Sequence, residues 1–191
     1  MLGFFKRILN RLQAARARKV ALILMDVDGT LTDGTLYVLP DGQEIKGYHV
    51  QDGLGIFLAH LAGLKLGIIT GKTSRALEVR AGRLGLEELH QGIIDKKKVL
   101  LEIAQRHQLR LEQVAFIGDD LGDLEVMRAV GFPAAVADAH PAIKKTARYL
   151  CHRPGGRGAV REVIEFILKA QGRWASLQER ASEIKSSSQN L

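Results

Sequence analysis

The 191-residue sequence predicts a three-layer, Rossmann-like α/β domain with a mainly parallel sheet. From residue 20 onward, short apolar runs rich in branched residues alternate with longer amphipathic stretches, a pattern typical of strands buried on both faces with helices between them. One segment interrupts the alternation in the manner of a β-hairpin. We find no internal repeat and no linker between domains.

Five apolar runs are the expected strands, and five amphipathic stretches are the expected helices. The strands cover residues 20–26, 64–70, 113–119, 133–138 and, as the last candidate, 148–152. The helices cover residues 53–63, 73–84, 96–107, 121–130 and 159–171. Together they predict one α/β domain over residues 20–172, followed by a C-terminal tail, residues 173–191.

The exception to the alternation is the segment 35–50. Two strand-like runs flank a Pro-Asp-Gly turn at residues 40–42, so the segment is predicted to be a β-hairpin. The hairpin and one helix use all the chain between Asp28 and Gly71, and between Gly71 and Lys96 there is room for one helix and a loop. No additional domain fits in either interval.

The composition is that of a soluble globular protein, with 46% hydrophobic and 26% charged residues. No apolar run approaches the roughly 20 residues of a transmembrane helix, so we expect no transmembrane segment. The single cysteine, Cys151, cannot form an internal disulfide, and no secretory signal follows the basic N-terminus. These features predict a cytoplasmic protein.

The net charge of +7 is concentrated at the N-terminus, because residues 1–19 contain six basic and no acidic side chains. The remainder is nearly neutral, which argues against a nucleic-acid-binding face. In residues 1–19 the apolar side chains recur at helical spacing opposite the cations, which predicts a basic amphipathic extension. Such a helix can pack on a neighbouring surface or make peripheral contact with anionic lipid.

Polar residues follow three of the predicted strands, at the edge where ligands bind in this class of sheet. They are Asp26 and Asp28 after the first strand, Thr70, Gly71 and Lys72 after the second, and Asp119, Asp120 and Asp123 after the third. Asp26 and Asp28 are two residues apart at a strand end, so their carboxylates project the same way. We therefore expect five carboxylates and a hydroxyl to converge on one rim.

Carboxylates this close together repel one another unless a cation neutralises them. Mg²⁺ fits, because it prefers oxygen ligands and takes only a few of them from the protein, leaving room for water and phosphate. One carboxylate can attack phosphorus to form an aspartyl phosphate, while its neighbour acts as general acid and then as general base. A lysine from the run 96–98, at the start of a predicted helix, can balance the transition-state charge.

Two other interpretations of these motifs fail. The loop after Asp26 could bind calcium as an EF-hand does, but Thr30 and Leu31 stand where that pattern needs Asp or Asn and then Gly. Residues 67–73 are similar to a nucleotide-binding P-loop, yet three residues, not four, separate the glycines, and those residues belong to an apolar strand.

Residues 26–34 and 118–123 resemble the motifs of the haloacid dehalogenase (HAD) superfamily of phosphotransferases. The resemblance implies four catalytic roles: nucleophile Asp26, acid/base Asp28, phosphate-binding hydroxyl Thr70 and phosphate-side lysine Lys96. It also implies Mg²⁺ held by Asp26, Asp119 and the main-chain carbonyl of Asp28. Asp123 is then a supporting or alternative acidic position, and Asp120 is either a helix N-cap or a neighbour of the metal.

Over residues 20–172 the chain further resembles the lidless 3-deoxy-D-manno-octulosonate 8-phosphate (KDO 8-phosphate) phosphatases of lipopolysaccharide synthesis, so we expect the β-hairpin in place of a cap domain. The motifs that carry this resemblance include HVQDGLGI, ITGK, QGIIDK, VADAHP and GGRGAVREV. It implies a Mg²⁺-dependent homotetramer in which hairpins associate and a C-terminal segment approaches the neighbour's active site. The residues implied to hold the sugar acid are His49, Gln51, Asp52, Gly53, Lys72 and Arg80, and Gly71 and Arg157 complete the candidate substrate-binding set.

Alternatives remain for the substrate and for the chemistry. Lys72 stands where many relatives have Arg, which weakens a bidentate contact with a carboxylate. Related lidless enzymes act on nine-carbon ulosonate 9-phosphates, and a relative could also bind a sugar phosphate without hydrolysing it. A nucleic-acid end-processing phosphatase is disfavoured by the nearly neutral domain. The glycine-rich segment 152–162 is expected to be a flexible basic flap over the site.

Overall fold

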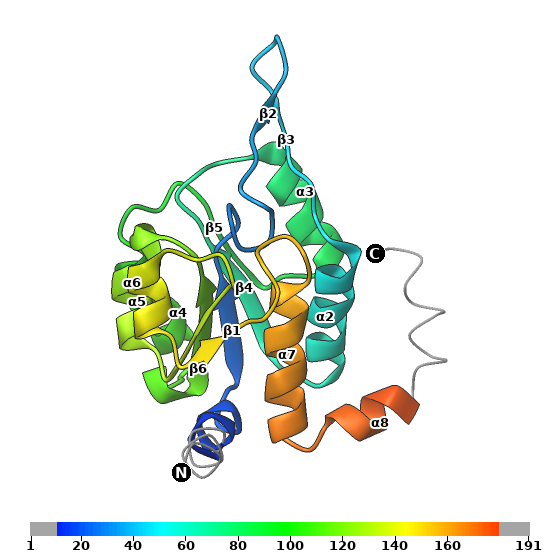
Figure 1. The fold of residues 1–191 in the computed structure, drawn as a ribbon, viewed down its shortest axis with the longest axis vertical. Coiled ribbons are helices and arrows are strands. Elements are labelled where there is room, and N and C mark those ends of the chain that lie inside the picture. Colours follow the sequence, from blue (N-terminus) through cyan, green and yellow to red (C-terminus); the bar gives the residue numbers. More distant parts are fainter. Residues whose placement is uncertain (1–10, 180–191) are drawn as a thin grey trace.

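A six-stranded parallel sheet forms the centre of the protein, whose computed structural model describes residues 11–179 (Figure 1). The strands are β1 (Leu22–Met25), β4 (Lys65–Ile69), β5 (Glu88–His90), β6 (Val114–Gly118), β7 (Phe132–Ala135) and β8 (Tyr149–Leu150). Their order is β5-β4-β1-β6-β7-β8, and every neighbouring pair is parallel. The predicted α/β fold with a mainly parallel sheet is therefore confirmed.

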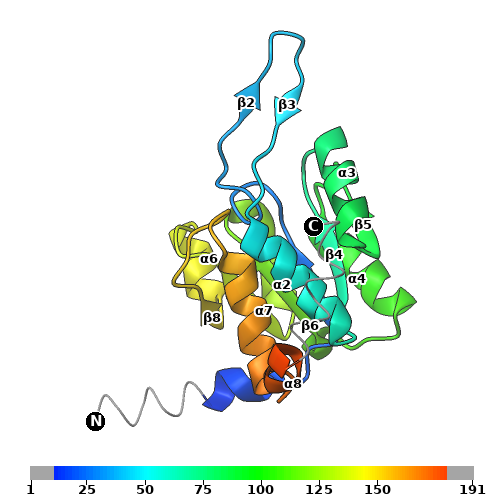
Figure 2. The ribbon, with the colours of Figure 1, turned by 90° about the vertical axis from the view of Figure 1, so that its right-hand side faces the viewer.

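Helices cover both faces of this sheet (Figures 1 and 2). On one face lie α2 (Val50–Leu61), α3 (Arg75–Leu84) and α7 (Ala159–Ala170), and on the other lie α4 (Lys96–Arg106), α5 (Leu124–Ala129) and α6 (Pro141–Thr146). This division follows from right-handed crossovers, because the chain moves from β1 toward β5 and then back across the sheet toward β8. A last short helix, α8 (Trp174–Glu179), follows α7.

The core lies between the central strands and the helices. All four residues of β1 and all five residues of β6 are buried, because these strands are covered on both faces. Phe116 and Phe132 are the largest of the fully buried side chains, and the Phe132 ring stacks on Phe166 of α7 with centroids 6.0 Å apart. The continuous apolar runs seen in the sequence thus become the middle of the sheet.

The predicted hairpin is present, but its strands are short. β2 (Tyr37–Val38) pairs with β3 (Glu44–Ile45) in an antiparallel arrangement and projects away from the sheet (Figures 1 and 2). The helix expected to start at residue 53 starts at Val50 instead. His49 explains the difference, since its side chain accepts a hydrogen bond from the main-chain N–H of Gln51 and caps the helix.

The strand β5 and the helix α6 are among the elements that were not predicted. β5 contains Glu88 and His90, which are untypical of a buried strand, and α6 is only six residues long. Proline begins α6 and His140 caps it by accepting a hydrogen bond from the N–H of Ala142 at 3.2 Å. Both elements lie in segments where short polar stretches gave no clear periodicity.

Only part of the predicted basic extension, residues 1–19, is described. Residues 11–17 are helical, and Arg16 and Arg18 donate hydrogen bonds to the carbonyls of Gly131 (3.2 Å) and Ala170 (3.1 Å). This part of the extension therefore packs on the domain itself. The apolar residues before residue 11, and the tail after residue 179, lie outside the described residues. Within residues 11–179, no helix has both the length and the apolar character needed to cross a membrane.

A buried carboxylate anchors the edge strand β5. The side chain of Glu88 is 5% exposed and accepts hydrogen bonds from Arg106 at 2.7 and 2.9 Å, and its oxygens lie 2.7 Å from ring nitrogens of His90 and His107. Burial raises the pKa of Glu88, but these hydrogen bonds outweigh it and hold the pKa below its ordinary value of 4.5.

We expect Glu88→Gln to lower the free energy of unfolding at pH 7 by about 2 kcal/mol, because Arg106 and the two histidines lose their charged, buried acceptor. The folded-state pKa of Glu88 is lowered, so its stabilising contribution is complete above pH 4.5 and is lost as the pH falls through the folded-state pKa. The difference between variant and wild type should therefore shrink at acid pH. Urea unfolding across a pH series measures it.

Glu87→Gln is the matched control, because Glu87 pairs with Lys65 at 3.1 Å and both side chains are 42% exposed. Its effect should stay below about 0.5 kcal/mol at every pH. Equal losses for the two variants would contradict the role given to Glu88.

Candidate active site

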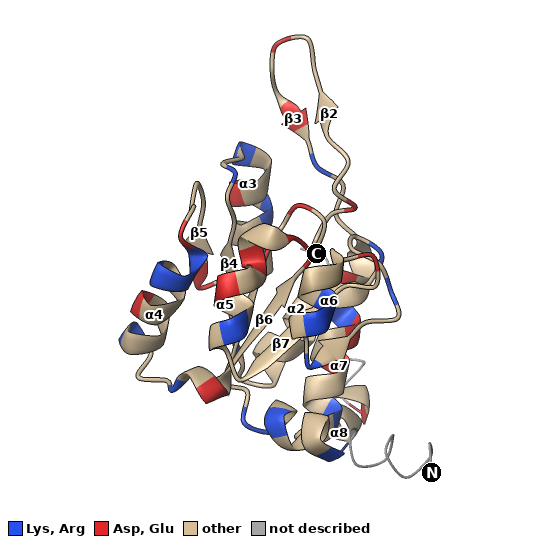
Figure 3. Ribbon diagram, turned by 60° about the vertical axis from the view of Figure 1, so that its left-hand side comes forward, with Lys and Arg blue, Asp and Glu red and all other residues tan. Residues whose placement is uncertain are grey.

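Three carboxylates meet at the carboxyl edge of the sheet. Asp26 directly follows β1, Asp119 directly follows the adjacent strand β6, and Asp123 ends the short 3₁₀ turn η2 (Leu121–Asp123). One carboxylate oxygen from each residue lies within 4.8 Å of the other two. In Figure 3, acidic segments gather near the foot of the hairpin. The first and third strand ends are thus brought together, as the sequence predicts.

Lys96, at the start of α4, places its ammonium between two of these acids. Its side chain is 6% exposed, and Nζ lies 2.6 Å from Asp123 Oδ1 and 2.9 Å from Asp26 Oδ1. Burial alone would lower the pKa of Lys96, but the two carboxylates outweigh burial and raise it, so the side chain is an ammonium. One positive charge faces three carboxylates.

The remaining negative charge fits a divalent cation. Burial, together with the charge of Asp26, raises the pKa of Asp119 to about 7 and that of Asp123 to about 6. Although Lys96 is close, the buried Oδ1 of Asp26 accepts no well-directed hydrogen bond from the described residues. Three carboxylates with oxygens this close together are a donor set suited to Mg²⁺. The main-chain carbonyl of Asp28 stays a predicted further ligand.

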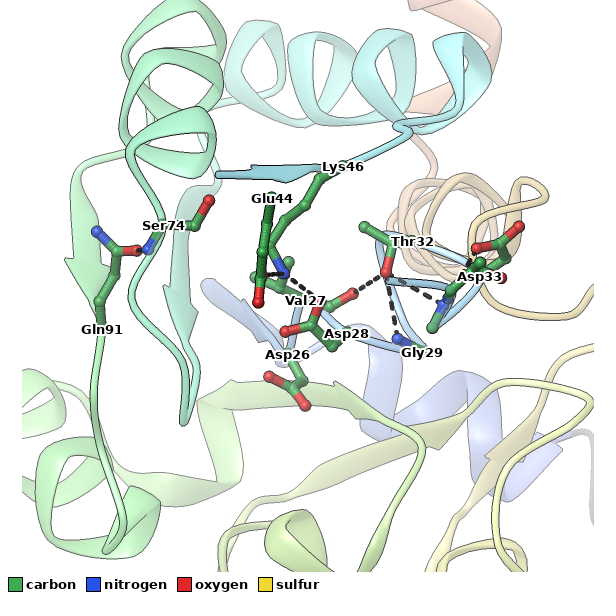
Figure 4. A network of polar contacts seen from close by, with 12 residues as sticks. Asp26, Val27, Asp28, Gly29, Thr32, Asp33, Glu44, Lys46, Ser74 and Gln91 are labelled. Carbon is green, nitrogen blue, oxygen red and sulfur yellow. Dashed lines mark hydrogen bonds and ion pairs between the residues drawn. The ribbon is translucent and has the colours of Figure 1, made fainter. Parts of the chain in front are cut away.

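The loop after β1 carries Asp26 and Asp28 and contacts the loop after β6; its side chains are drawn in Figure 4. Thr30 donates a hydrogen bond from Oγ1 to Asp119 Oδ1 at 2.8 Å, which joins this loop to the one after β6. Gly29 has φ +87°, and a Cβ there would lie 2.1 Å from Asp119 Oδ2, so only glycine fits. Asp28 forms an ion pair with Lys46, a residue that the sequence analysis did not identify.

The glycine-rich segment is not the flexible flap that the sequence predicts. A Cβ on Gly155 would lie 1.8 Å from the carbonyl oxygen of Gly29, and one on Gly156 would lie 2.4 Å from the main-chain nitrogen of Asp33. The N–H of Gly156 donates to the carbonyl of Thr30 at 3.0 Å. The prediction was wrong because these glycines allow close packing against the Asp28 loop, which restrains the segment.

The VADAHP motif links these loops. The main-chain N–H of His140 donates to the carbonyl of Asp119 at 2.8 Å, and Asp138 Oδ1 accepts a hydrogen bond from the N–H of Gly155 at 2.9 Å. The motif therefore supports both the metal-side loop and the glycine-rich turn. Its sequence marked it as distinctive, but gave no sign of this supporting role.

The predicted phosphate-side and sugar-side residues have different surroundings. Thr70 is buried at the end of β4, while Gly71 and Lys72 are exposed. A cavity of about 690 Å³ opens beside them, between the hairpin and the start of α3. It is lined by Gly42, Gln43, Glu44, Thr73, Ser74, Arg75, Ala76 and Val79. A small polar molecule therefore has room beside Lys72, although the cavity itself does not include the carboxylates.

Several substrate-binding candidates hold other parts of the protein. Asp52 is buried, and its carboxylate accepts hydrogen bonds from the main-chain N–H groups of Gly158 (3.2 Å) and Arg161 (2.8 Å), so it fixes the start of α7. Burial raises the pKa of Asp52. Gln51 Oε1 accepts a hydrogen bond from Arg153. These contacts direct Asp52 away from a ligand.

The remaining candidates each make a different contact. Gly53 leaves room for Arg80, since a Cβ there would lie 2.4 Å from Nη2 of Arg80. The Arg80 guanidinium also lies over the Tyr48 ring, 5.8 Å from its centroid. Arg157 is exposed and pairs with Asp33 at 3.5 Å. Asp120 accepts a hydrogen bond from the N–H of Leu121 at 2.8 Å and thereby caps η2.

Comparison with known proteins shows the family to which the chain belongs. Residues 76–164 match the sequence profile of haloacid dehalogenase-like hydrolases. The 3-deoxy-D-manno-octulosonate 8-phosphate phosphatase of Yersinia pestis is 46% identical over 156 residues, which cover 82% of this chain and 83% of that protein. The chain belongs to the KDO 8-phosphate phosphatase family. The predicted resemblance is therefore confirmed.

Solved structures of this family have the same fold. The structure of the Yersinia pestis phosphatase matches with a TM-score of 0.84 and 43% identity, covering 86% of this chain and 89% of that one. A KDO 8-phosphate phosphatase from Moraxella catarrhalis, solved in complex with magnesium ion, phosphate ion and a KDO molecule, matches with a TM-score of 0.86 and 38% identity. The match covers 87% of this chain and 96% of that one.

If the three carboxylates hold the metal, Asp119→Asn should weaken Mg²⁺ binding about tenfold or more, because it removes a charged oxygen ligand. Isothermal titration calorimetry of the purified protein measures this affinity. Asp41→Asn, which makes the same chemical change at the exposed tip of the hairpin, should leave the affinity unchanged. An unaltered affinity in Asp119→Asn would argue against the site.

The tight packing of the glycine-rich turn predicts that Gly155→Ala lowers the free energy of unfolding by about 2 kcal/mol, because the new methyl group overlaps the Gly29 carbonyl. Urea unfolding measures the loss. At Gly82, in α3, a Cβ meets nothing within 4 Å, so Gly82→Ala should raise stability by about 0.5 kcal/mol. A flexible turn at Gly155 would instead tolerate the methyl group without loss.

Proposed function

We propose that the protein is a Mg²⁺-dependent phosphatase that hydrolyses KDO 8-phosphate to KDO and inorganic phosphate in lipopolysaccharide synthesis. The observation that supports this most strongly is the cluster of Asp26, Asp119 and Asp123 beside the buried ammonium of Lys96. It occurs in a chain that is 46% identical to a phosphatase of that name. The reaction proceeds through an aspartyl phosphate.

In the first step Asp26 is the nucleophile. A carboxylate oxygen of Asp26 forms a bond to phosphorus while the bond between phosphorus and the sugar oxygen breaks. Asp28 gives its proton to the departing sugar oxygen. Lys96 lies 2.9 Å from Asp26 Oδ1, close enough to offset negative charge on the phosphoryl group. When bound, Mg²⁺ neutralises carboxylate and phosphate charge.

In the second step water takes the place of the sugar. Asp28, now a carboxylate, accepts a proton from the water as the water oxygen attacks phosphorus. The bond between phosphorus and Asp26 breaks, which releases phosphate and restores the Asp26 carboxylate. Asp26 is the nucleophile in the first step and the leaving group in the second. Asp28 is the acid in the first step and the base in the second, so both residues return to their starting states.

Substrate recognition is part of the same proposal. Thr70 supplies a buried hydroxyl for the phosphate, and His49, Gly71 and the cations Lys72, Arg80 and Arg157 serve the sugar acid, whose carboxylate suits a basic partner. Asp52, Gln51 and Gly53 then act indirectly, through the contacts that fix α7, Arg153 and Arg80.

The hairpin supports the proposed homotetramer. Its exposed apolar side chains are Leu36, Tyr37, Val38, Leu39 and Ile45. Apolar side chains gathered on one projecting element are characteristic of a surface that contacts another protein. We propose that hairpins associate there and that neighbouring subunits complete the active sites. A cytoplasmic location belongs to the same proposal.

The decisive experiment measures phosphate release from KDO 8-phosphate, a nine-carbon ulosonate 9-phosphate, hexose phosphates and a 3′-phosphorylated oligonucleotide, with Mg²⁺ or EDTA. We expect strong preference for KDO 8-phosphate and complete loss of activity with EDTA. Asp26→Asn should lower the rate by at least about 10³-fold, because it removes the nucleophile. Asp41→Asn should retain full activity.

Each alternative predicts a different result. Preference for the nine-carbon substrate would keep the mechanism and change the sugar. Tight binding of a sugar phosphate without turnover would favour a non-catalytic relative. Full activity in Asp26→Asn would refute the aspartyl phosphate mechanism.

A further inference from the structure

Lys46 stands out because it is a cation removed from water at the edge of the active site. Its side chain is only 2% exposed. A buried ammonium is costly unless carboxylates pair with it. Its partners are Asp28, with which it makes an ion pair and a hydrogen bond, and Glu44, whose Oε2 lies 3.9 Å away. The lysine therefore belongs to the electrostatics of the catalytic loop.

The hairpin determines where this ammonium lies. Glu44 is in β3 and Lys46 follows that strand, and residues two apart in an extended segment project to the same side. Figure 4 shows both side chains extending from the hairpin toward Asp28, with the Lys46 nitrogen between the two carboxylates. On the other side, hydrogen bonds from Thr30, Leu31 and Thr32 to the carbonyl of Val27 hold the Asp28 loop.

We propose that Lys46 is a positioning residue for the reaction. Its ammonium holds one carboxylate oxygen of Asp28, so that the other oxygen faces the leaving oxygen of the phosphate ester. A carboxyl group can rotate about two side-chain bonds, and a charge-assisted hydrogen bond restricts that rotation. This inference rests on the proposed function, because it assigns Lys46 to the acid/base of that reaction.

The departing group provides a test that separates this role from a purely structural one. A sugar alkoxide needs a proton in order to leave, whereas p-nitrophenolate is a weak base and leaves without one. Because kcat/KM reports the steps up to the first irreversible one, it isolates attack by Asp26 from the later hydrolysis of the aspartyl phosphate. The measured quantity is the ratio of kcat/KM for KDO 8-phosphate to kcat/KM for p-nitrophenyl phosphate.

We expect Lys46→Met to lower kcat/KM for the sugar phosphate about 30-fold, within the roughly 10²- to 10⁴-fold contribution of a general acid. The value for p-nitrophenyl phosphate should fall less than about threefold, since no proton transfer is needed there. Lys46→Arg keeps the charge and should restore most of the loss. If Lys46→Met does not fold, the ratio is measured instead in Lys46→Gln, whose side chain ends in a polar group.

The control is Lys65→Met, which removes an exposed lysine paired with Glu87 and should leave the ratio at the wild-type value. Equal losses on both substrates in Lys46→Met would overturn the proposal, because they would mean that Lys46 serves phosphate binding or folding. No loss on either substrate would overturn it as well.

The design keeps this proposal distinguishable from the proposed function. If wild-type protein prefers another sugar phosphate, the proposed substrate is wrong, and the ratio is read with that sugar phosphate instead. If wild-type protein hydrolyses p-nitrophenyl phosphate but no sugar phosphate, both proposals fail. A normal substrate preference with an unchanged ratio in Lys46→Met overturns the role of Lys46 alone.

Discussion

Repulsion among three carboxylates is the constraint on which the rest of the site depends. Asp26, Asp119 and Asp123 bring oxygens within 4.8 Å of one another, and only the ammonium of Lys96 stands against them in the described residues. Such a cluster does not assemble by attraction, so the fold must hold it. Two adjacent buried strands, β1 and β6, supply two of the acids from rigid backbone, and the N–H of Asp119 donates to Asp123 Oδ2 at 3.0 Å. A bound cation reduces this repulsion.

Close backbone packing provides the second part of that rigidity. The glycine-rich turn contacts the Asp28 loop through main-chain atoms, and that loop in turn contacts the Asp119 side chain of the loop after β6. Side chains at Gly29 or Gly155 would separate these segments. These glycines therefore allow segments of backbone to pack closely, more than they give the loops freedom to move. The loops that carry the proposed catalytic groups are therefore fixed to one another and to the sheet without a cap domain to hold them.

The sequence was sufficient for five of the six strands of the sheet, for the convergence of its acidic strand ends and for the family. Apolar runs define buried strands directly, and the carboxyl ends of parallel strands share one edge. The sequence was insufficient where the local structure depends on contacts between residues far apart in the chain. β5 was missed because Glu88 is stabilised by Arg106 and His107 of another element, which no local pattern reveals. Lys46 was missed because only the folded hairpin brings it to Asp28. The flap was predicted wrongly because glycines alone do not distinguish a flexible turn from a close-packed one.

The hairpin therefore has two ends with different physical roles. Its exposed strands carry apolar side chains such as Tyr37 and Val38, whereas at its foot Lys46 is withdrawn from solvent against Asp28. A phosphoryl-transfer site gains from the exclusion of water around its proton donor, because interactions between charges strengthen as the local dielectric falls. In this lidless fold, the foot of the hairpin covers Asp28, the proposed donor, from one side. In the proposed homotetramer, a contact that shifts the exposed strands would reach the Lys46–Asp28 pair through only a few residues of extended chain, which would connect the proposed assembly with the geometry of the proposed acid/base.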